Sequence, residues 1–403
     1  MNLITINQYG SVPTVGYAGR VYYLSKYLAR HGANVEYLFQ SNHYLIKSQG
    51  RYPEVDGLFY RVCKLLPNSS SKSVRRIINW FLFACYVALF RPRLKKVDYV
   101  FYSAPSLVGW LGAYLLSRRT GSKLILDIRD VWPATLEEIG GYSASSPPIK
   151  ILRALETLAY KHSDMLTSNL PGFGVRLAEL PTCRQSEFYW LPNGVDPEEY
   201  EKALSEAGRT ELCNKVSSDE KFIIGYVGSL GLANAIEQLL DLAEKIQHLN
   251  LEFYLVGDGD MASSLQAEAA TRGLARVRFT GPVSKSEALS FMSSVDLLVL
   301  AWKDSPLYRY GIGANKLSEY LWSGKPVLNF YRGFDDPVEI SGGGLSCSHA
   351  ESQNAVSWVQ SLMEGGADVQ SVLGTKAKHF AREHFDYEDV ALRFLRKLES
   401  HAN

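Results

Sequence analysis

Apolar and polar positions follow one repeating order along most of this 403-residue chain. A short apolar run is followed by a loop and then by apolar residues at helical spacing. Such runs predict buried parallel strands, and the segments between them predict helices on both faces of a sheet. In the first half, the pattern predicts strands at 3–6, 34–39, 99–102, 124–128, 165–168 and 188–191, and helices at 21–30, 107–118 and 149–161.

The same order resumes after residue 220. Strands are predicted at 222–227, 252–256, 277–280, 297–300 and 327–330, and helices at 236–247, 261–272, 285–293 and 315–322. A cluster of turn-forming residues at 192–197 and a polar stretch behind it separate the halves. We therefore predict an α/β protein with two Rossmann-like, doubly wound domains at 1–192 and 221–385, joined by a linker at 193–220. The tail at 386–403 is predicted to form a helix that packs on either domain, with the N-terminal domain as the candidate.

Composition narrows the functional classes. Lys and Arg together number 43 and Asp and Glu 42, and a net charge of +1 argues against a nucleic-acid binder. Five scattered cysteines without C-x-x-C spacing fit neither a zinc ribbon nor a disulfide framework, and they suggest a reducing cytosol. Because the chain has no signal-peptide pattern and no run of 18 apolar residues, we expect no membrane-spanning helix.

Glycine-containing turns follow three predicted strands of the second domain. They contain Gly228, Ser229 and Gly231 after the first strand, Gly257 after the second, and Pro282 and Val283 after the third. Since the carboxyl ends of parallel strands form the ligand-binding edge of an open sheet, these turns together predict a phosphate site. Ordinary strand–helix turns are the alternative. The pattern is not G-x-G-x-x-G, which disfavours a dinucleotide-dependent dehydrogenase.

A glycine loop at 308–314 runs directly into the predicted helix 315–322. Lys316 and Glu319 are three residues apart on this helix and therefore share a face. A cation beside a diphosphate and a carboxylate that accepts two ribose hydroxyls would suit a nucleoside diphosphate. A surface ion pair in the first helical turn is the alternative.

Charged residues also end a strand in the first domain. Arg129 and Asp130 follow the predicted strand 124–128 and precede Trp132 and Pro133. Charges at this position either face a cleft or cap a helix, and both interpretations stay open.

The stretch 57–97 contains no Asp or Glu. It holds an apolar run at 77–90, too short to span a membrane, between basic flanks formed by Arg75, Arg76, Arg91, Arg93, Lys95 and Lys96. Basic flanks around an apolar segment suit an anionic membrane surface, and a core helix with a solvated basic rim is the alternative. We predict a membrane-associating segment at 74–96 that inserts Trp80, Phe81 and Phe83.

Together, these motifs resemble the retaining nucleotide-sugar transferases of GT-B glycosyltransferase family 4. The resemblance rests on the opening glycine loop, Asp-Ile-Arg-Asp-Val-Trp-Pro, Pro-Asn-Gly-Val-Asp, Val-Gly-Asp-Gly, and Asn-Lys-Leu-Ser-Glu-Tyr-Leu-Trp-Ser-Gly-Lys-Pro-Val. Bacterial members that build O-antigen or capsule on a lipid carrier are most similar, with the fucosamine (FucNAc) transferases as the nearest subgroup.

The resemblance implies two domains that face a cleft. From the basic apolar segment we expect the protein at the inner face of the cytoplasmic membrane. The resemblance implies a nucleotide-diphosphate sugar of the UDP-N-acetyl type in the C-terminal domain, and neither metal ion nor other cofactor. It also implies an undecaprenyl-diphosphate-linked acceptor in the N-terminal domain, near the loop that holds Gly10, Gly16 and Gly19. The donor set is completed by Arg309, Gly311 and Asn315, and the catalytic candidates are Asp130, Arg129 and Lys316.

Several positions depart from the family pattern. Glu319 matches the second Glu of the Glu-x7-Glu motif, which holds the ribose, but Gly311 replaces the first Glu. Ser229 and Asn234 stand near the places of the usual basic pair, so Lys316 and Arg309 are the candidate replacements. Arg129 and Asp130 occupy a place where many members have His-Asp, so no histidine role is carried over.

Two other functions stay open. A GT-B nucleotide-sugar epimerase would need no membrane surface, and the basic apolar segment argues against it. A non-catalytic partner subunit would explain the missing first Glu and the missing basic pair.

Overall fold

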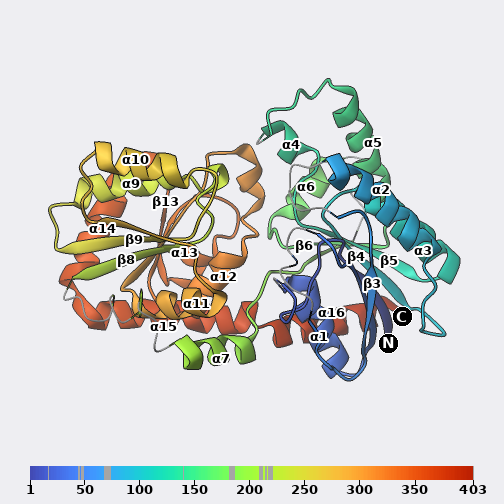
Figure 1. The fold of residues 1–403 in the computed structure, drawn as a ribbon. Coiled ribbons are helices and arrows are strands. Elements are labelled where there is room, and N and C mark those ends of the chain that lie inside the picture. The colour runs from blue at the N-terminus through green and yellow to red at the C-terminus, as the bar shows by residue number, and fades with distance from the viewer. Residues whose placement is uncertain are drawn as a thin grey trace. The chain divides into compact units, whose positions relative to one another are not determined.

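The computed structural model describes residues 1–16, 18–43, 46, 50–67, 74–138, 140–180, 187–207, 212–213, 216 and 221–402. The chain forms two compact units, Met1–Pro192 with Tyr387–Asn403, and Asn193–Asp386. Each unit is a parallel sheet with helices on both faces (Figure 1). The predicted α/β class with two doubly wound domains is confirmed.

The sheet of the first unit has seven strands in the order β3-β2-β1-β4-β5-β6-β7. All neighbouring strands are parallel, and β1 pairs with both β2 and β4. The order reverses between β1 and β4, the kind of position where open sheets bind ligands. The strands are β1 (Asn2–Ile6), β2 (Asn34–Gln40), β3 (Leu58–Cys63), β4 (Tyr99–Ala104), β5 (Lys123–Ile128), β6 (Met165–Ser168) and β7 (Phe188–Trp190).

The final helix of the chain completes the core of the first unit. Phe394 lies 5.8 Å from the ring of Phe101 and 5.7 Å from that of Tyr189, and Tyr387 stacks on Tyr23 at 5.0 Å. The final helix therefore belongs to the first compact unit. The helices here are α1 (Arg20–Arg30), α2 (Val74–Leu89), α3 (Val108–Thr120), α4 (Ala134–Glu138), α5 (Pro147–His162), α6 (Phe173–Glu179) and α16 (Tyr387–Ala402).

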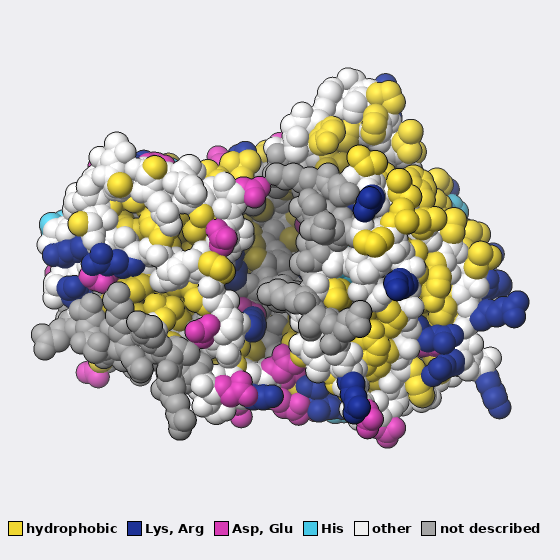
Figure 2. Space-filling model, in the orientation of Figure 1, with side chains coloured by type: hydrophobic (Ala, Val, Ile, Leu, Met, Phe, Trp, Pro, Cys, Tyr) yellow, Lys and Arg dark blue, Asp and Glu magenta, His cyan; other side chains and the backbone are white. Residues whose placement is uncertain are grey.

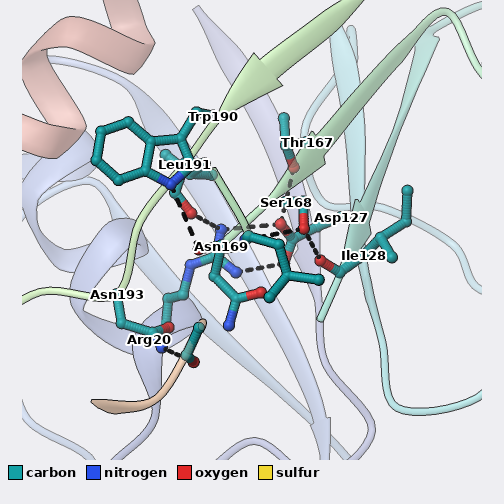
Figure 3. A network of polar contacts seen from close by, with 11 residues as sticks. Arg20, Asp127, Ile128, Thr167, Ser168, Asn169, Trp190, Leu191 and Asn193 are labelled. Carbon is teal, nitrogen blue, oxygen red and sulfur yellow. Dashed lines mark hydrogen bonds and ion pairs between the residues drawn. The ribbon is translucent and has the colours of Figure 1, made fainter. Parts of the chain in front are cut away.

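A fully buried ion pair connects helix α1 with strand β5 in the first unit (Figure 3). Arg20, the first residue of α1, meets both carboxylate oxygens of Asp127 on β5, at 2.9 and 2.8 Å, and the two side chains are 1% and 0% exposed. Arg20 also donates to Leu191 O at 2.6 Å, and Thr167 on β6 donates to Asp127 at 2.8 Å. Because each charge has several partners, the network stabilises one arrangement of α1, β5, β6 and the chain after β7.

The sheet of the second unit has six strands in the order β10-β9-β8-β11-β12-β13, and its order reverses between β8 and β11. The strands are β8 (Phe222–Val227), β9 (Leu251–Val256), β10 (Val277–Gly281), β11 (Leu297–Ala301), β12 (Val327–Phe330) and β13 (Gly344–Cys347). The helices are α7 (Pro197–Ala207), α9 (Ile236–Ile246), α10 (Ala262–Thr271), α11 (Lys285–Ser294), α12 (Asn315–Trp322), α13 (Pro337–Ser341), α14 (Ser352–Glu364) and α15 (Gly366–Phe385), with short turns η2 (Leu232–Asn234), η3 (Pro306–Tyr310) and η4 (His349–Glu351).

Several features differ from the sequence predictions, among them two strands and the linker. Strands β3 and β13 were not predicted, and both carry partly exposed residues that break an apolar run. The predicted linker contains α7, which belongs to the second unit. The hydroxyl of Tyr200 on α7 lies 3.0 Å from Ser293 Oγ on α11. Residues 208–211, 214, 215 and 217–220 of that stretch lie outside the described residues. Within the described part of the chain, no helix is long and apolar enough to cross a membrane.

The buried pair makes a prediction about stability. Asp127→Ala leaves the Arg20 guanidinium buried without its carboxylate, and breaking such a pair costs roughly 3–5 kcal/mol. We expect urea to unfold the first unit at a clearly lower concentration. Glu137→Ala is the control, because Glu137 pairs with the exposed Arg153 and exposed pairs contribute only about 0–1 kcal/mol. Equal shifts in the two variants would contradict the assigned role.

Candidate functional site

Three loops at the carboxyl edge of the second sheet are joined by backbone hydrogen bonds. Gly228 N donates to Val256 O at 2.9 Å, Leu230 N to Asp258 O at 2.9 Å, and Gly257 N to Gly281 O at 3.0 Å. A Cβ atom on Gly257 would lie 1.9 Å from Gly228 O, so this approach requires glycine. The structure therefore brings together the three predicted turns, including Pro282 and Val283, which directly follow Gly281.

Lys316 lies where the strand order of this sheet reverses. Its Nζ is 4.8 Å from the ring centroid of Tyr226, on β8, and 4.7 Å from that of Trp302, directly after β11. It donates to the Tyr226 hydroxyl at 3.0 Å and also to Asn234 Oδ1. The Lys316 ammonium thus contacts Asn234. This is one of the two residues that stand near the positions of the family's usual basic pair.

The surroundings of Lys316 disfavour its charge. Burial lowers the pKa of the Lys316 amine to about 7. Its hydrogen-bond partners are neutral, and among the described residues no carboxylate forms an ion pair with it. A cation held this way is prepared for an anionic ligand, because the ligand would supply the missing opposite charge.

Tyr320 fixes the helix that carries Lys316. Its hydroxyl accepts a hydrogen bond from Val227 N at 2.6 Å and lies 3.2 Å from Val227 O, at the end of β8. Glu319, on the same helix, pairs with Lys285, the first residue of α11. Lys316 and Glu319 therefore come from one helix but contact different elements: Lys316 contacts the turn after β8, and Glu319 contacts the first residue of α11.

The remaining donor candidates lie around this core. Ser229 O accepts from the Tyr226 hydroxyl at 2.8 Å and from Asn234 Nδ2 at 2.9 Å, and Gly231 precedes η2. The Arg309 guanidinium lies over the ring of its neighbour Tyr310 at 4.7 Å. Gly311 has a φ of 95°, where glycine is favoured, and Asn315 begins α12.

The first-domain candidates occupy the corresponding edge of the other sheet. Arg129 and Asp130 directly follow β5, and Gly10 follows β1. A Cβ on Gly10 would lie 2.1 Å from the Tyr37 hydroxyl, so this glycine allows a close approach. Gly16 forms an isolated bridge with Ile46, and Gly19 precedes α1. The catalytic candidates thus divide between the units, with Arg129 and Asp130 in the first and Lys316 in the second.

The aromatic partners of the site were not predicted from the sequence. Tyr226 reads as one more apolar residue of a strand, and Trp302 and Tyr320 read as core residues. Their only sequence signal is their position, since Tyr226 and Trp302 stand at the ends of two strands that become neighbours. Among the described residues, no group of three or more His, Cys, Asp and Glu side chains is arranged to hold a metal ion.

The second unit is similar in sequence to known glycosyltransferases. Residues 221–364 match the family described as Glycosyl transferases group 1. Two relatives are TuaH of Bacillus subtilis, named for teichuronic acid biosynthesis, and WcaI of Escherichia coli, named for colanic acid biosynthesis. TuaH is 24% identical over 53% of this chain and 52% of its own, and WcaI is 22% identical over 56% of each. The chain therefore spans about half the length of these curated relatives.

Solved structures match nearly the whole chain. Sucrose-phosphate synthase of Thermosynechococcus elongatus superposes with a TM-score of 0.73 and 15% identity, over 99% of this chain and 98% of its own. HepE of Anabaena, solved with UDP, superposes with a TM-score of 0.68 and 16% identity, over 99% and 100%. At these identities the likeness establishes the fold, and the chain has the GT-B fold that the sequence predicts.

The lowered pKa of Lys316 predicts how stability changes with pH. Below about pH 7 the folded second unit holds a charged, desolvated ammonium, and this cost is lost as pH rises from 7 toward the usual lysine pKa of about 10.4. Lys316→Met should therefore raise the melting temperature most at pH 6, and the difference from the parent should shrink toward pH 10. Scanning calorimetry across this range measures it. A difference that stays constant with pH would contradict the desolvated cation.

Proposed function

We propose that this protein is a retaining glycosyltransferase that acts in bacterial surface polysaccharide synthesis. It transfers a sugar from a nucleotide-diphosphate sugar, of the UDP-N-acetyl type, to a lipid-linked saccharide. The observation that carries the proposal is the Lys316 ammonium, held beside three joined glycine loops at the point where the strand order reverses. The names of the relatives support the pathway, and the UDP bound to HepE supports the donor class. Within this class, the motifs favour family 4 and the fucosamine transferase subgroup.

In the proposed donor complex, the diphosphate lies against the loops after β8 and β9. Backbone N–H groups and the positive end of the following helix favour an anion there. Lys316 neutralises the diphosphate, and Glu319 leaves Lys285 to accept hydrogen bonds from the ribose. Arg309 lies in η3, shortly before the helix that carries Lys316, and is the second candidate cation.

The proposed reaction needs no metal ion. The bond between the anomeric carbon and the diphosphate oxygen breaks, while a bond to the acceptor oxygen forms on the same face of the sugar. The leaving diphosphate oxygen takes the acceptor proton, and Lys316 with the loop amides stabilises the charge that develops there. Arg129 and Asp130 of the first unit orient the acceptor in this proposal.

An exposed apolar face on the first unit supports a location at the inner face of the cytoplasmic membrane. On α2, the side chains of Val74, Phe81 and Leu89 are 72%, 58% and 75% exposed. Helix α3 contacts both α2 and α5, and it adds Leu115 at 55%, while α5 adds Ile151 at 67%. Figure 2 shows hydrophobic side chains gathered over the region of α2. An apolar surface of this kind marks an interaction site.

The structure corrects which residues of α2 are available for insertion. Phe83 is fully buried, and Trp80 donates to the Tyr9 hydroxyl at 2.9 Å, so neither belongs to the exposed face. The inner side of α2 packs closely on α3, where a Cβ on Gly112 would lie 2.2 Å from Ala84 O. Of the three residues predicted to insert, only Phe81 is exposed.

Donor binding tests the proposed role of Glu319. Hydrogen bonds to charged groups contribute about 1.5–3 kcal/mol. Glu319→Ala should therefore weaken UDP binding by roughly ten- to a hundredfold. Calorimetric titration in excess EDTA, repeated with Mg²⁺, also tests the metal-free site, and we expect equal UDP affinity in both. Glu339→Ala is the control, because Glu339 is an exposed acid on α13 of the same unit. Unchanged affinity in Glu319→Ala, or binding only with Mg²⁺, would contradict the proposed donor site.

Vesicle sedimentation tests the membrane surface. We expect the protein to bind vesicles rich in phosphatidylglycerol, less strongly at high salt, because exposed bases line the segment after α2. Ile77→Ser with Phe81→Ser should weaken binding at least tenfold, since a fully buried apolar side chain contributes about 1.5–3 kcal/mol.

Val372→Ser on α15 of the second unit is the matched control, because Val372 is exposed to a similar extent, 56% against 58% for Phe81. The proposal fails if anionic and neutral vesicles bind the protein equally, or if the double variant binds like the control.

A further inference from the structure

A second cation lies between aromatic rings, in the first unit. The Arg76 guanidinium, in the first turn of α2, is 5.4 Å from the ring centroid of Tyr9 and 5.5 Å from that of Trp80. Trp80 donates to the Tyr9 hydroxyl at 2.9 Å and meets Trp132 edge to face at 6.0 Å. Tyr9 comes from the loop after β1 and Trp132 from the loop after β5, so the cluster lies at the carboxyl edge of the sheet.

The chemistry of this cluster suits an anionic, sugar-bearing ligand. A guanidinium presents several donors in one plane and matches phosphate oxygens. Tyr9, Trp80 and Trp132 are only partly buried, so their rings offer apolar surface to the ring of a sugar.

An incompletely satisfied polar group lies beside the cluster. Gln8, next to Tyr9, is fully buried, and its Nε2 donates to Asn79 O on α2 at 3.1 Å. Its Oε1 has no hydrogen-bond partner among the described residues. Since buried polar atoms are nearly always paired, this acceptor is suited to a water or a ligand hydroxyl.

The same helix carries the apolar face described above. Arg76 and Trp80, one turn apart, point to the sheet edge, while Ile77 and Phe81, one position further on in each turn, are exposed. Helix α2 therefore presents a cationic, aromatic site and a lipid-compatible surface side by side. A ligand that contacts both must have an anionic head and a hydrocarbon chain.

We propose that Arg76, Trp80 and Trp132 bind the head of a diphosphate-linked lipid, while its hydrocarbon chain runs along the exposed face of α2. This inference rests on the proposed function and specifies its acceptor site. Arg76 holds the diphosphate, and the tryptophan rings hold the sugar attached to it. Trp132 is two residues from Asp130, so the bound sugar lies near the residue proposed to orient the acceptor.

Binding of farnesyl diphosphate in neutral bicelles tests the proposal. We expect Arg76→Gln to weaken its binding by tenfold or more, and Trp80→Phe to change it less than twofold because this probe carries no sugar. Farnesol should bind the parent and both variants alike. Arg75→Gln is the matched control, because it removes an equal charge from the adjacent, exposed position and should change affinity less than twofold. UDP affinity should stay unchanged in all three variants, because the donor site is in the other unit.

The outcomes separate this inference from the donor proposal. Absence of UDP binding to the parent protein would overturn the proposed function. Normal UDP binding, with equal losses of farnesyl diphosphate affinity in Arg75→Gln and Arg76→Gln, would overturn the specific site and leave only a general basic surface. Competition between UDP and farnesyl diphosphate for one site on the parent would also overturn it.

Discussion

In a doubly wound parallel sheet the strand order reverses at one point. The loops that follow the strands on either side of that point leave space for a ligand at the carboxyl ends of the strands. Both units of this chain place a cation between aromatic rings at this edge. In the second unit Lys316 lies between Tyr226 and Trp302, and in the first Arg76 lies between Tyr9 and Trp80. The aromatic rings stabilise a positive charge less than a carboxylate would. The proposed donor and acceptor sites both depend on this arrangement.

The Arg20–Asp127 pair shows the opposite arrangement. It is also buried at a sheet edge, but its guanidinium meets both carboxylate oxygens and a backbone carbonyl. Its charge is balanced within the protein, so the pair stabilises the fold and has little to offer a ligand. This balance of charge makes Arg20 a structural cation.

The architecture was largely predictable because buried parallel strands are short apolar runs, as at 222–227 and 327–330. Edge strands β3 and β13 escaped detection because part of each is exposed and the apolar pattern is interrupted. The orientation of α2 could not be predicted, because a helix that is apolar on most sides has no polar stripe to show which residues face the core. Phe83 was therefore expected at the surface, although it is buried against the protein.

The candidate site was predicted only in part. Its glycine turns and Lys316 have local signals, but the contact between Lys316 and Tyr226 joins residues 90 positions apart. Spacing along one helix suggested that Lys316 and Glu319 act on one nucleotide, but it could not show that their partners lie on different elements of the sheet edge. The partners of Arg76 were hidden for the same reason, since Tyr9, Trp80 and Trp132 meet only in the folded sheet.

The most direct test of the proposed activity is sugar transfer itself. The purified protein is incubated with a panel of radiolabelled UDP-sugars and a bacterial lipid extract that contains diphosphate-linked saccharides. We expect one donor to place its label in the lipid fraction, with an equal amount of UDP released. Release of free sugar without labelled lipid, or no turnover of any donor by a protein that binds UDP, would contradict a glycosyltransferase and favour a non-catalytic partner.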